Sequence, residues 1–184
     1  MFEDVRLALP EPRRITLHTH LGNEIENEIA VHPVPQHAID KFHRIAAQHP
    51  RWIHRKPPTG IYNCFGHVWA SRRTAVYEKF DEAVLRVRED DGYRTIDWER
   101  EIPTVGDLAC YWESVNPYRD CSHVGLVVSV QPQGKGLPPV VWILSKWDDT
   151  TGEVVHEAAD HVFQGVHLEY WTDRPLNQPR RILT

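Results

Sequence analysis

Cys64 is the residue of this chain with the clearest capacity for covalent chemistry. A thiol becomes a nucleophile when its pKa falls, and a helix N-terminus lowers that pKa because unpaired backbone N–H groups and the helix dipole favour the thiolate. Cys64 follows Asn63, which is well suited to cap a helix, and apolar residues then recur at helical spacing in Phe65, Val68 and Trp69. The sequence therefore predicts a helix that begins near Cys64 and buries one of its faces.

An imidazole within hydrogen-bonding reach would complete the activation of this thiol. His123 is the strongest candidate because it opens the apolar run HVGLVVSV, at the edge of a predicted strand. Cys121 lies two positions earlier, so it is expected on the same strand face and is the second candidate nucleophile. Its loop context lacks the helix start that lowers a thiol pKa, and Cys64 is therefore preferred.

Helix signals come first along the chain and strand signals follow. Segregated helices and strands predict an α+β fold, with helices packed on one face of an antiparallel sheet of about five strands. Apolar periodicity predicts helices over 37–50 and 78–90 in addition to the one at Cys64. Short β-branched and aromatic runs predict strands over 107–112, 123–130, 139–147, 152–158 and 166–172.

The N-terminal region differs from the remainder in composition. Residues 1–58 are rich in Pro and His and contain one predicted helix, and PPTG at 57–60 is a plausible boundary. We therefore expect an N-terminal extension over 1–58 and a core over 59–184.

Composition restricts the setting in which the protein works. Apolar residues make up 41 % of the chain and charged residues 26 %, and no apolar run approaches the roughly 20 residues of a membrane span. The N-terminus lacks a secretion signal pattern, which favours a cytoplasmic location, with non-classical export as the alternative. A net charge of −5 does not favour a nucleic-acid partner, and three cysteines without a signal indicate reduced thiols.

The order of these motifs resembles the NlpC-type and CHAP-type amidases, the bacterial branch of the papain-like cysteine hydrolases. In that family a cysteine begins a helix, a GDL stretch leads into a core strand and the catalytic histidine opens the next strand as HVG. Residues 106–108 and 123–125 match these two tripeptides. The resemblance covers roughly residues 60–170 and implies that Cys64 is the nucleophile and His123 the general base, and then the acid toward the leaving group.

The resemblance also implies a third residue that orients the imidazole. His156 in GEVVHEA resembles the third histidine of NlpC-type sequences and is preferred, while Ser145 and Lys146 on the preceding strand are the alternatives. The oxyanion hole would combine the Cys64 backbone N–H with a donor just upstream, for which Tyr62 and Asn63 are candidates.

Together these features predict a cysteine peptidase or amidase that cleaves an amide or isopeptide bond through an acyl-enzyme on Cys64. The expected substrate is a peptide, a peptidoglycan-like polymer or another amide, and no cofactor or metal is needed. Acyl transfer or deamidation would use the same Cys–His pair. The N-terminal extension is a possible site for a protein partner.

Two other interpretations remain open. The sequence Asn63-Cys64-Phe65-Gly66 departs from the Asp-Cys-Ser-Gly usual in NlpC-type enzymes, which supports a catalytically inactive binding or regulatory module. His18 and His20 would place two imidazoles on one strand face, as in some zinc sites, but no CxxC or HExxH motif accompanies them.

Overall fold

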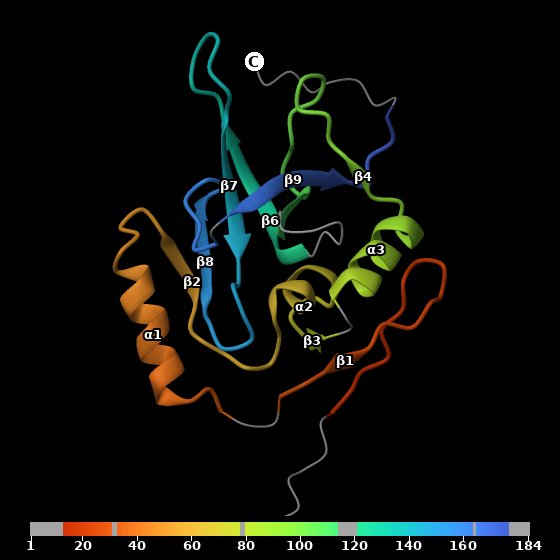
Figure 1. The fold of residues 1–184 in the computed structure, drawn as a ribbon, viewed down its shortest axis with the longest axis vertical. Coiled ribbons are helices and arrows are strands. Elements are labelled where there is room, and N and C mark those ends of the chain that lie inside the picture. The colour runs from red at the N-terminus through yellow and green to blue at the C-terminus, as the bar shows by residue number, and fades with distance from the viewer. Residues whose placement is uncertain (1–12, 31–32, 78–79, 114–120, 164, 177–184) are drawn as a thin grey trace, which may run out of the picture.

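A single large antiparallel sheet organises the protein. The structure, a computed structural model, describes residues 13–30, 33–77, 80–113, 121–163 and 165–176. Seven strands form the sheet in the order β2-β8-β7-β6-β5-β9-β4, and β1 and β3 form a separate two-stranded pair (Figure 1). The strands are β1 (Asn27–Glu28), β2 (Ile53–Lys56), β3 (Ala75–Val76), β4 (Arg94–Thr95), β5 (Leu108–Glu113), β6 (Cys121–Gln131), β7 (Val140–Ser145), β8 (Glu153–Glu157) and β9 (Val166–Thr172).

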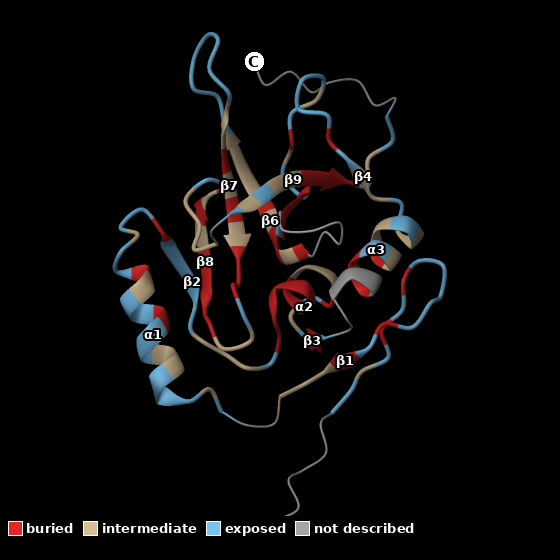
Figure 2. Cartoon of the chain, viewed as in Figure 1, coloured by how far each residue is buried: buried red, intermediate tan, exposed pale blue. Residues whose placement is uncertain are grey.

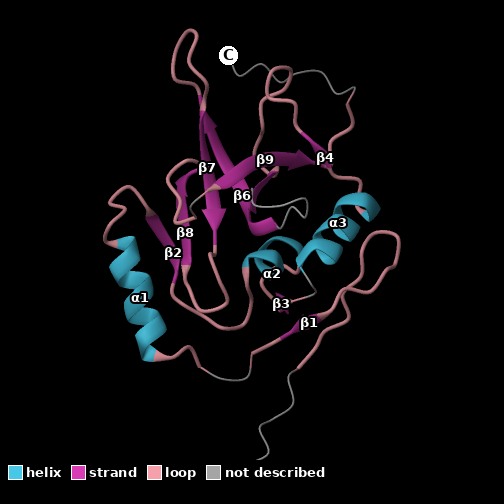
Figure 3. Ribbon diagram, viewed as in Figure 1, coloured by secondary structure: helices cyan, strands magenta, loops and turns pink. Residues whose placement is uncertain are grey.

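Three helices accompany this sheet in the described part of the chain: α1 (Gln36–Ala46), α2 (Cys64–Trp69) and α3 (Phe80–Asp90) (Figure 3). The predicted α+β class, with a large antiparallel sheet and few helices, is confirmed. The five predicted strands correspond to β5 through β9, but the sheet has seven strands because β2 and β4 join its two ends. These two strands have only four and two residues, too few for a readable alternation of apolar and polar side chains.

The described part of the N-terminal region is built into the core of the fold. β2 pairs with β8 and extends the main sheet, although it lies within the predicted extension over 1–58. Phe42 and Ala46 of α1 pack against Trp52, Trp147 and Val154 in one buried cluster. This region therefore covers part of the sheet and adds a strand to it.

The sheet has two buried faces, which we call the helix face and the back face. Residues on the helix face pack with α2 and α3, and they include Leu108, Cys110, Val124 and Trp171. Residues on the back face form a second apolar cluster that includes Ala109, Tyr111, Val127, Ile143 and Tyr170. Figure 2 shows the resulting burial of α2 and of much of the sheet.

An irregularity in β6 decides which face its first residues occupy. Tyr111 of β5 pairs with His123, but the next residue, Trp112, pairs with Cys121. Ser122 is therefore an extra residue in β6, as in a β-bulge. Paired residues share a face, so the regular pairing puts His123 on the back face with Tyr111, and the bulge moves Cys121 to the helix face with Trp112. The expectation that Cys121 and His123 share a face is wrong for this reason.

No helix in the described ranges combines the length and the apolar character that a membrane crossing requires.

Candidate functional site

The predicted helix start at Cys64 is confirmed. Asn63 is the N-cap of α2, and its side-chain oxygen accepts a hydrogen bond from the Gly66 N–H at 2.9 Å. The same amide group bonds the backbone of Val76 in both directions, at 2.7 and 3.1 Å, and so ties α2 to β3. A Cβ at Gly66 would lie 1.7 Å from the carbonyl oxygen of Thr74, so only glycine permits this close approach.

The thiol of Cys64 is enclosed in the apolar cluster of the helix face. The residue is 5 % exposed and belongs to the same cluster as Cys110, Cys121 and Val124. Burial raises the pKa of Cys64 to about 12, although a hydrogen bond from the Val124 backbone lowers it in part. The sulfur is therefore a neutral thiol at physiological pH.

His123 lies on the other side of β6. It is fully buried on the back face, where its ring stacks on Phe163 with centroids 4.8 Å apart and lies 5.4 Å from Tyr111. Val124, the next residue along the strand, contributes to the helix face with Cys64. The structure thus does not bring the Cys64 thiol and the His123 imidazole together, because the backbone of β6 runs between them.

The structure does bring His123, Ser145 and His156 together. The Ser145 hydroxyl lies 3.0 Å from Nε2 of His123 and 2.9 Å from Nε2 of His156. Nδ1 of His156 lies 2.8 Å from the carbonyl oxygen of Glu157. We call these three side chains the His–Ser–His network. Ser145, an alternative third residue in the sequence analysis, is its centre, and His156 reaches His123 only through it.

The directions of the hydrogen bonds follow from the carbonyl at one end. A carbonyl oxygen only accepts, so Nδ1 of His156 carries the hydrogen and its Nε2 is an acceptor. The Ser145 hydroxyl therefore donates to His156 and accepts from Nε2–H of His123. Nδ1 of His123 is then a bare acceptor, and it has no hydrogen-bond partner among the described residues.

Both imidazoles of the network are neutral. Burial lowers the pKa of His156 to about 4, and burial together with the neighbouring His156 holds the pKa of His123 well below its usual value. Neutral rings match the hydrogen-bond directions, because a protonated ring would donate from both nitrogens. The network is thus a neutral polar chain in the core of the back face, in which Nδ1 of His123 alone lacks a partner among the described residues.

The two oxyanion candidates have other hydrogen-bond partners. The Tyr62 hydroxyl donates to Oε1 of Glu153 at 2.6 Å, and burial together with this carboxylate raises the pKa of Tyr62. The side-chain amide of Asn63 is committed to the cap of α2 and to Val76. These hydrogen bonds engage the side chains of both Tyr62 and Asn63, so neither is free to donate to an oxyanion beside Cys64.

Lys146, the other alternative third residue, is directed away from the His–Ser–His network. Its ammonium group donates to the carbonyl oxygens of Thr59 and Thr151 and lies 5.1 Å from the centre of the Tyr62 ring. Burial lowers its pKa to about 8, partly offset by acidic neighbours such as Asp148. Lys146 therefore holds the chain segments before α2 and before β8 together.

A buried carboxylate that the sequence analysis missed lies near α2. Glu153 is 1 % exposed and accepts hydrogen bonds from Tyr62 and from two guanidinium nitrogens of Arg72, while Nε2 of His67 lies 3.9 Å away. Burial opposes its ionisation, yet the bonds from Arg72 and Tyr62 lower the pKa of Glu153. Ser71 and Arg72 adopt left-handed backbone angles, with φ of 50° and 67°, to deliver the guanidinium.

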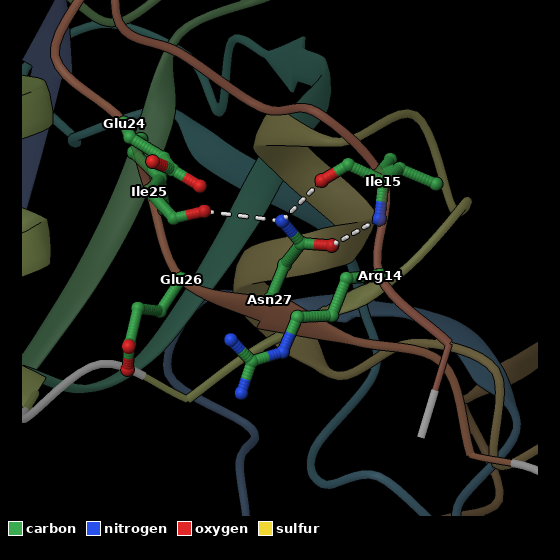
Figure 4. A pocket seen from close by; sticks show the side chains of 6 residues that line it. All are labelled: Arg14, Ile15, Glu24, Ile25, Glu26 and Asn27. Carbon is green, nitrogen blue, oxygen red and sulfur yellow. Dashed lines mark hydrogen bonds between the residues drawn. The ribbon is translucent and has the colours of Figure 1, made fainter. Parts of the chain in front are cut away.

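A surface pocket of about 360 Å³ opens at the N-terminal hairpin (Figure 4). Its floor is the side chain of Asn27, which bonds the backbone of Ile15 at 2.8 and 3.0 Å and the carbonyl of Ile25 at 3.1 Å. Arg14, Glu24 and Glu26 complete the lining. None of the predicted catalytic residues lines this pocket.

Metal ligands are a separate question. Within the described ranges, no group of three or more His, Cys, Asp or Glu side chains is placed to hold a metal ion, and this includes the surroundings of His18 and His20.

No protein-family model, no curated protein and no solved structure matches the chain. The function is therefore argued from the geometry of the site.

Proposed function

We propose that the chain is a non-catalytic binding or regulatory module with a papain-like fold. The fold proposal is supported by a capped helix that begins at Cys64 and packs on an antiparallel sheet. The GDL stretch at 106–108 leads into β5, and HVG at 123–125 lies near the start of β6. The functional proposal is carried by one observation: Cys64 and His123 lie on opposite faces of β6. A thiol without an imidazole on its own side of the sheet has no general base.

The ionisation of Cys64 supports the same proposal. Because burial raises the pKa of Cys64 to about 12, this thiol is protonated at neutral pH, whereas a free cysteine is a few per cent thiolate. His123 is neutral and engaged with Ser145, so its structural role is to fix the packing of β6 on β7.

A cysteine hydrolase is the second candidate, and one observation favours it. Cys64 is the first residue of a capped helix, and the Val124 backbone N–H bonds its sulfur, as suits a nucleophile. Turnover would require His123 on the helix face, whereas its regular pairing with Tyr111 places it on the back face. Acyl transfer and deamidation share this requirement.

Thiol labelling at mildly acidic pH separates the two candidates. Iodoacetamide reacts with a catalytic thiolate at about pH 6, where ordinary thiols are protonated. We expect Cys64 of the folded protein to react no faster than free glutathione, as followed by peptide mass spectrometry. Cys110 and Cys121 are buried on the same face and serve as internal references.

A different labelling result would refute the proposal of a non-catalytic module. Stoichiometric labelling of Cys64 that is lost in both His123→Ala and His123→Gln, with circular dichroism unchanged, would establish the thiolate–imidazole pair and favour the hydrolase. The glutamine variant keeps most of the side-chain volume, so it guards against a loss of labelling caused by a collapsed core.

A further inference from the structure

The segment that contains α1 and β2 has a charge opposite to that of the rest of the chain. Residues 37–56 contain five Lys and Arg residues, one Asp and four His. With histidine neutral, the net charge of the segment is +4 in a chain of net charge −5, so the other residues together carry −9. A concentrated charge of this kind selects partners of the opposite sign.

The basic side chains of α1 point outward. His37, Lys41 and Arg44 recur at i, i+4 and i+7 and are all exposed, which places them on one stripe of the helix. Phe42 and Ala46 occupy the other side and are buried against the back face. The apolar side of α1 therefore packs on the sheet, and its basic stripe faces solvent.

β2 continues this surface at the end of the sheet. It is the terminal strand and pairs only with β8, so no strand of the described residues pairs with its other edge. All four of its residues, including Arg55 and Lys56, are exposed, and β2 is pale blue in Figure 2 beside α1. His43 of α1 stacks with His54 of β2 at a centroid distance of 6.4 Å, which joins the two elements into one α1–β2 surface.

The described residues do not neutralise the four Lys and Arg side chains of this surface. Within the described ranges, no carboxylate lies within ion-pair distance of Lys41, Arg44, Arg55 or Lys56. The nearby acidic groups are already engaged: Glu157 pairs with Arg51, Asp160 with His49, and Asp40 accepts from Gln36.

We infer that the α1–β2 surface docks an extended acidic segment of a partner protein. The inference rests on the proposed function in that it names the partner class of the binding module. The unpaired edge of β2 can accept a further strand through backbone hydrogen bonds, and the cations of both elements can pair with its carboxylates. Charged edge strands also prevent aggregation, but that role does not require the basic stripe on α1. The net negative charge of the remaining chain opposes a long polyanion, so a short acidic segment is favoured over nucleic acid.

Fluorescence anisotropy with the full chain tests this inference. The probe is a fluorescein-labelled peptide of about ten residues that alternates Glu and Thr, since alternation suits an added strand. The reference probes are a Lys–Thr peptide of the same length and a single-stranded oligodeoxynucleotide of similar length. We expect the Glu–Thr peptide to bind, added NaCl to weaken the binding, the Lys–Thr peptide not to bind, and the oligonucleotide to bind more weakly than the Glu–Thr peptide.

Matched charge reversals locate the binding site. Arg55→Glu on β2 and Lys41→Glu on α1 should each weaken binding by about fivefold. Lys135→Glu changes the net charge equally but lies on the exposed loop between β6 and β7, and it should leave the affinity unchanged. Amide resonances of residues 53–56 should shift on titration with the peptide.

Any one of three results would overturn the inference. Lys135→Glu could weaken binding as much as Arg55→Glu does, the oligonucleotide could bind more tightly than the Glu–Thr peptide, or the Glu–Thr peptide could fail to bind at low salt. These failures are independent of the thiol labelling above. A reactive Cys64 with an intact α1–β2 interaction would remove the non-catalytic module and keep the docking surface.

Discussion

Three buried neutral histidines make the stability of this protein strongly dependent on mild acid. Burial lowers the pKa of His67 and of His156 to about 4, and it holds that of His123 well below its usual value. Between about pH 6.5 and 4 the unfolded chain therefore binds more protons than the native protein. Stability that is fully present above the unfolded pKa is lost as the pH falls through this window.

The size of the effect follows from the shifts. Each pKa unit corresponds to about 1.4 kcal/mol, so at about pH 5 His67 and His156 each remove about 2 kcal/mol of stability relative to neutral pH. Together they remove about 4 kcal/mol, a large part of the stability of an ordinary domain, and the lowered pKa values of His123 and His161 act in the same direction. The lowered pKa of Glu153 acts mainly below the ordinary glutamate pKa of 4.5, so the range above about pH 5 reports chiefly on the histidines.

Urea unfolding at a series of pH values measures this directly, with the fluorescence of the seven tryptophans as the signal. We expect unfolding between about pH 6 and 5 to take up nearly one proton at each of His67 and His156, with further uptake at His123 and His161. His156→Gln should reduce that uptake by about one proton. A flat profile over this range, or greater stability in acid, would refute the assignment of neutral buried imidazoles.

Two further predictions concern packing. Ser145→Ala removes the hydroxyl that bonds both imidazoles of the His–Ser–His network and should destabilise the fold by about 1–3 kcal/mol. The control Ser122→Ala is half-buried, loses one hydrogen bond to a backbone carbonyl and should cost about 1 kcal/mol or less. Equal losses of stability for the two variants in urea unfolding would contradict the network. Gly66→Ala places a methyl group against the Thr74 carbonyl and should cost about 3 kcal/mol or more; a thermal midpoint equal to that of the unchanged protein would show that α2 does not approach β3 as described.

The features that sequence predicts well here are those set by neighbouring residues. The cap at Asn63 and the start of α2 at Cys64 depend on a few consecutive residues, and both are present. The five longer strands also follow from local alternation and turn residues, which is why their bounds agree closely with the predicted ranges.

The face of His123 could not be predicted in the same way. Strict alternation along HVGLVVSV says which residues share a face, but it does not say which face carries the helices. That depends on which side of the sheet receives α2 and α3: Val124 and Leu126 face these helices, so alternation directs His123 to the back face, away from Cys64. The bulge at Ser122 acts on the residue before it and moves Cys121 to the helix face.

The Glu153 cluster escaped prediction because its members are distant in sequence. Tyr62 and Arg72 precede Glu153 by 91 and 81 positions, and no local pattern relates them. A glutamate in a strand is ordinarily a solvent-facing residue, so its burial becomes evident only when the segment around α2 packs against β8.

The strand order has a consequence for how the polypeptide acquires its fold. β5, near the middle of the sheet, pairs with β6 on one side and with β9 on the other, across about 60 positions of chain. During synthesis the backbone N–H and C=O groups on that edge of β5, whose side chains are mostly buried and apolar, have no native neighbour until residues 166–172 leave the ribosome. Nascent chains are thus exposed to misassembly at β5, and completion of the sheet is a slow, late event that follows translation of β9.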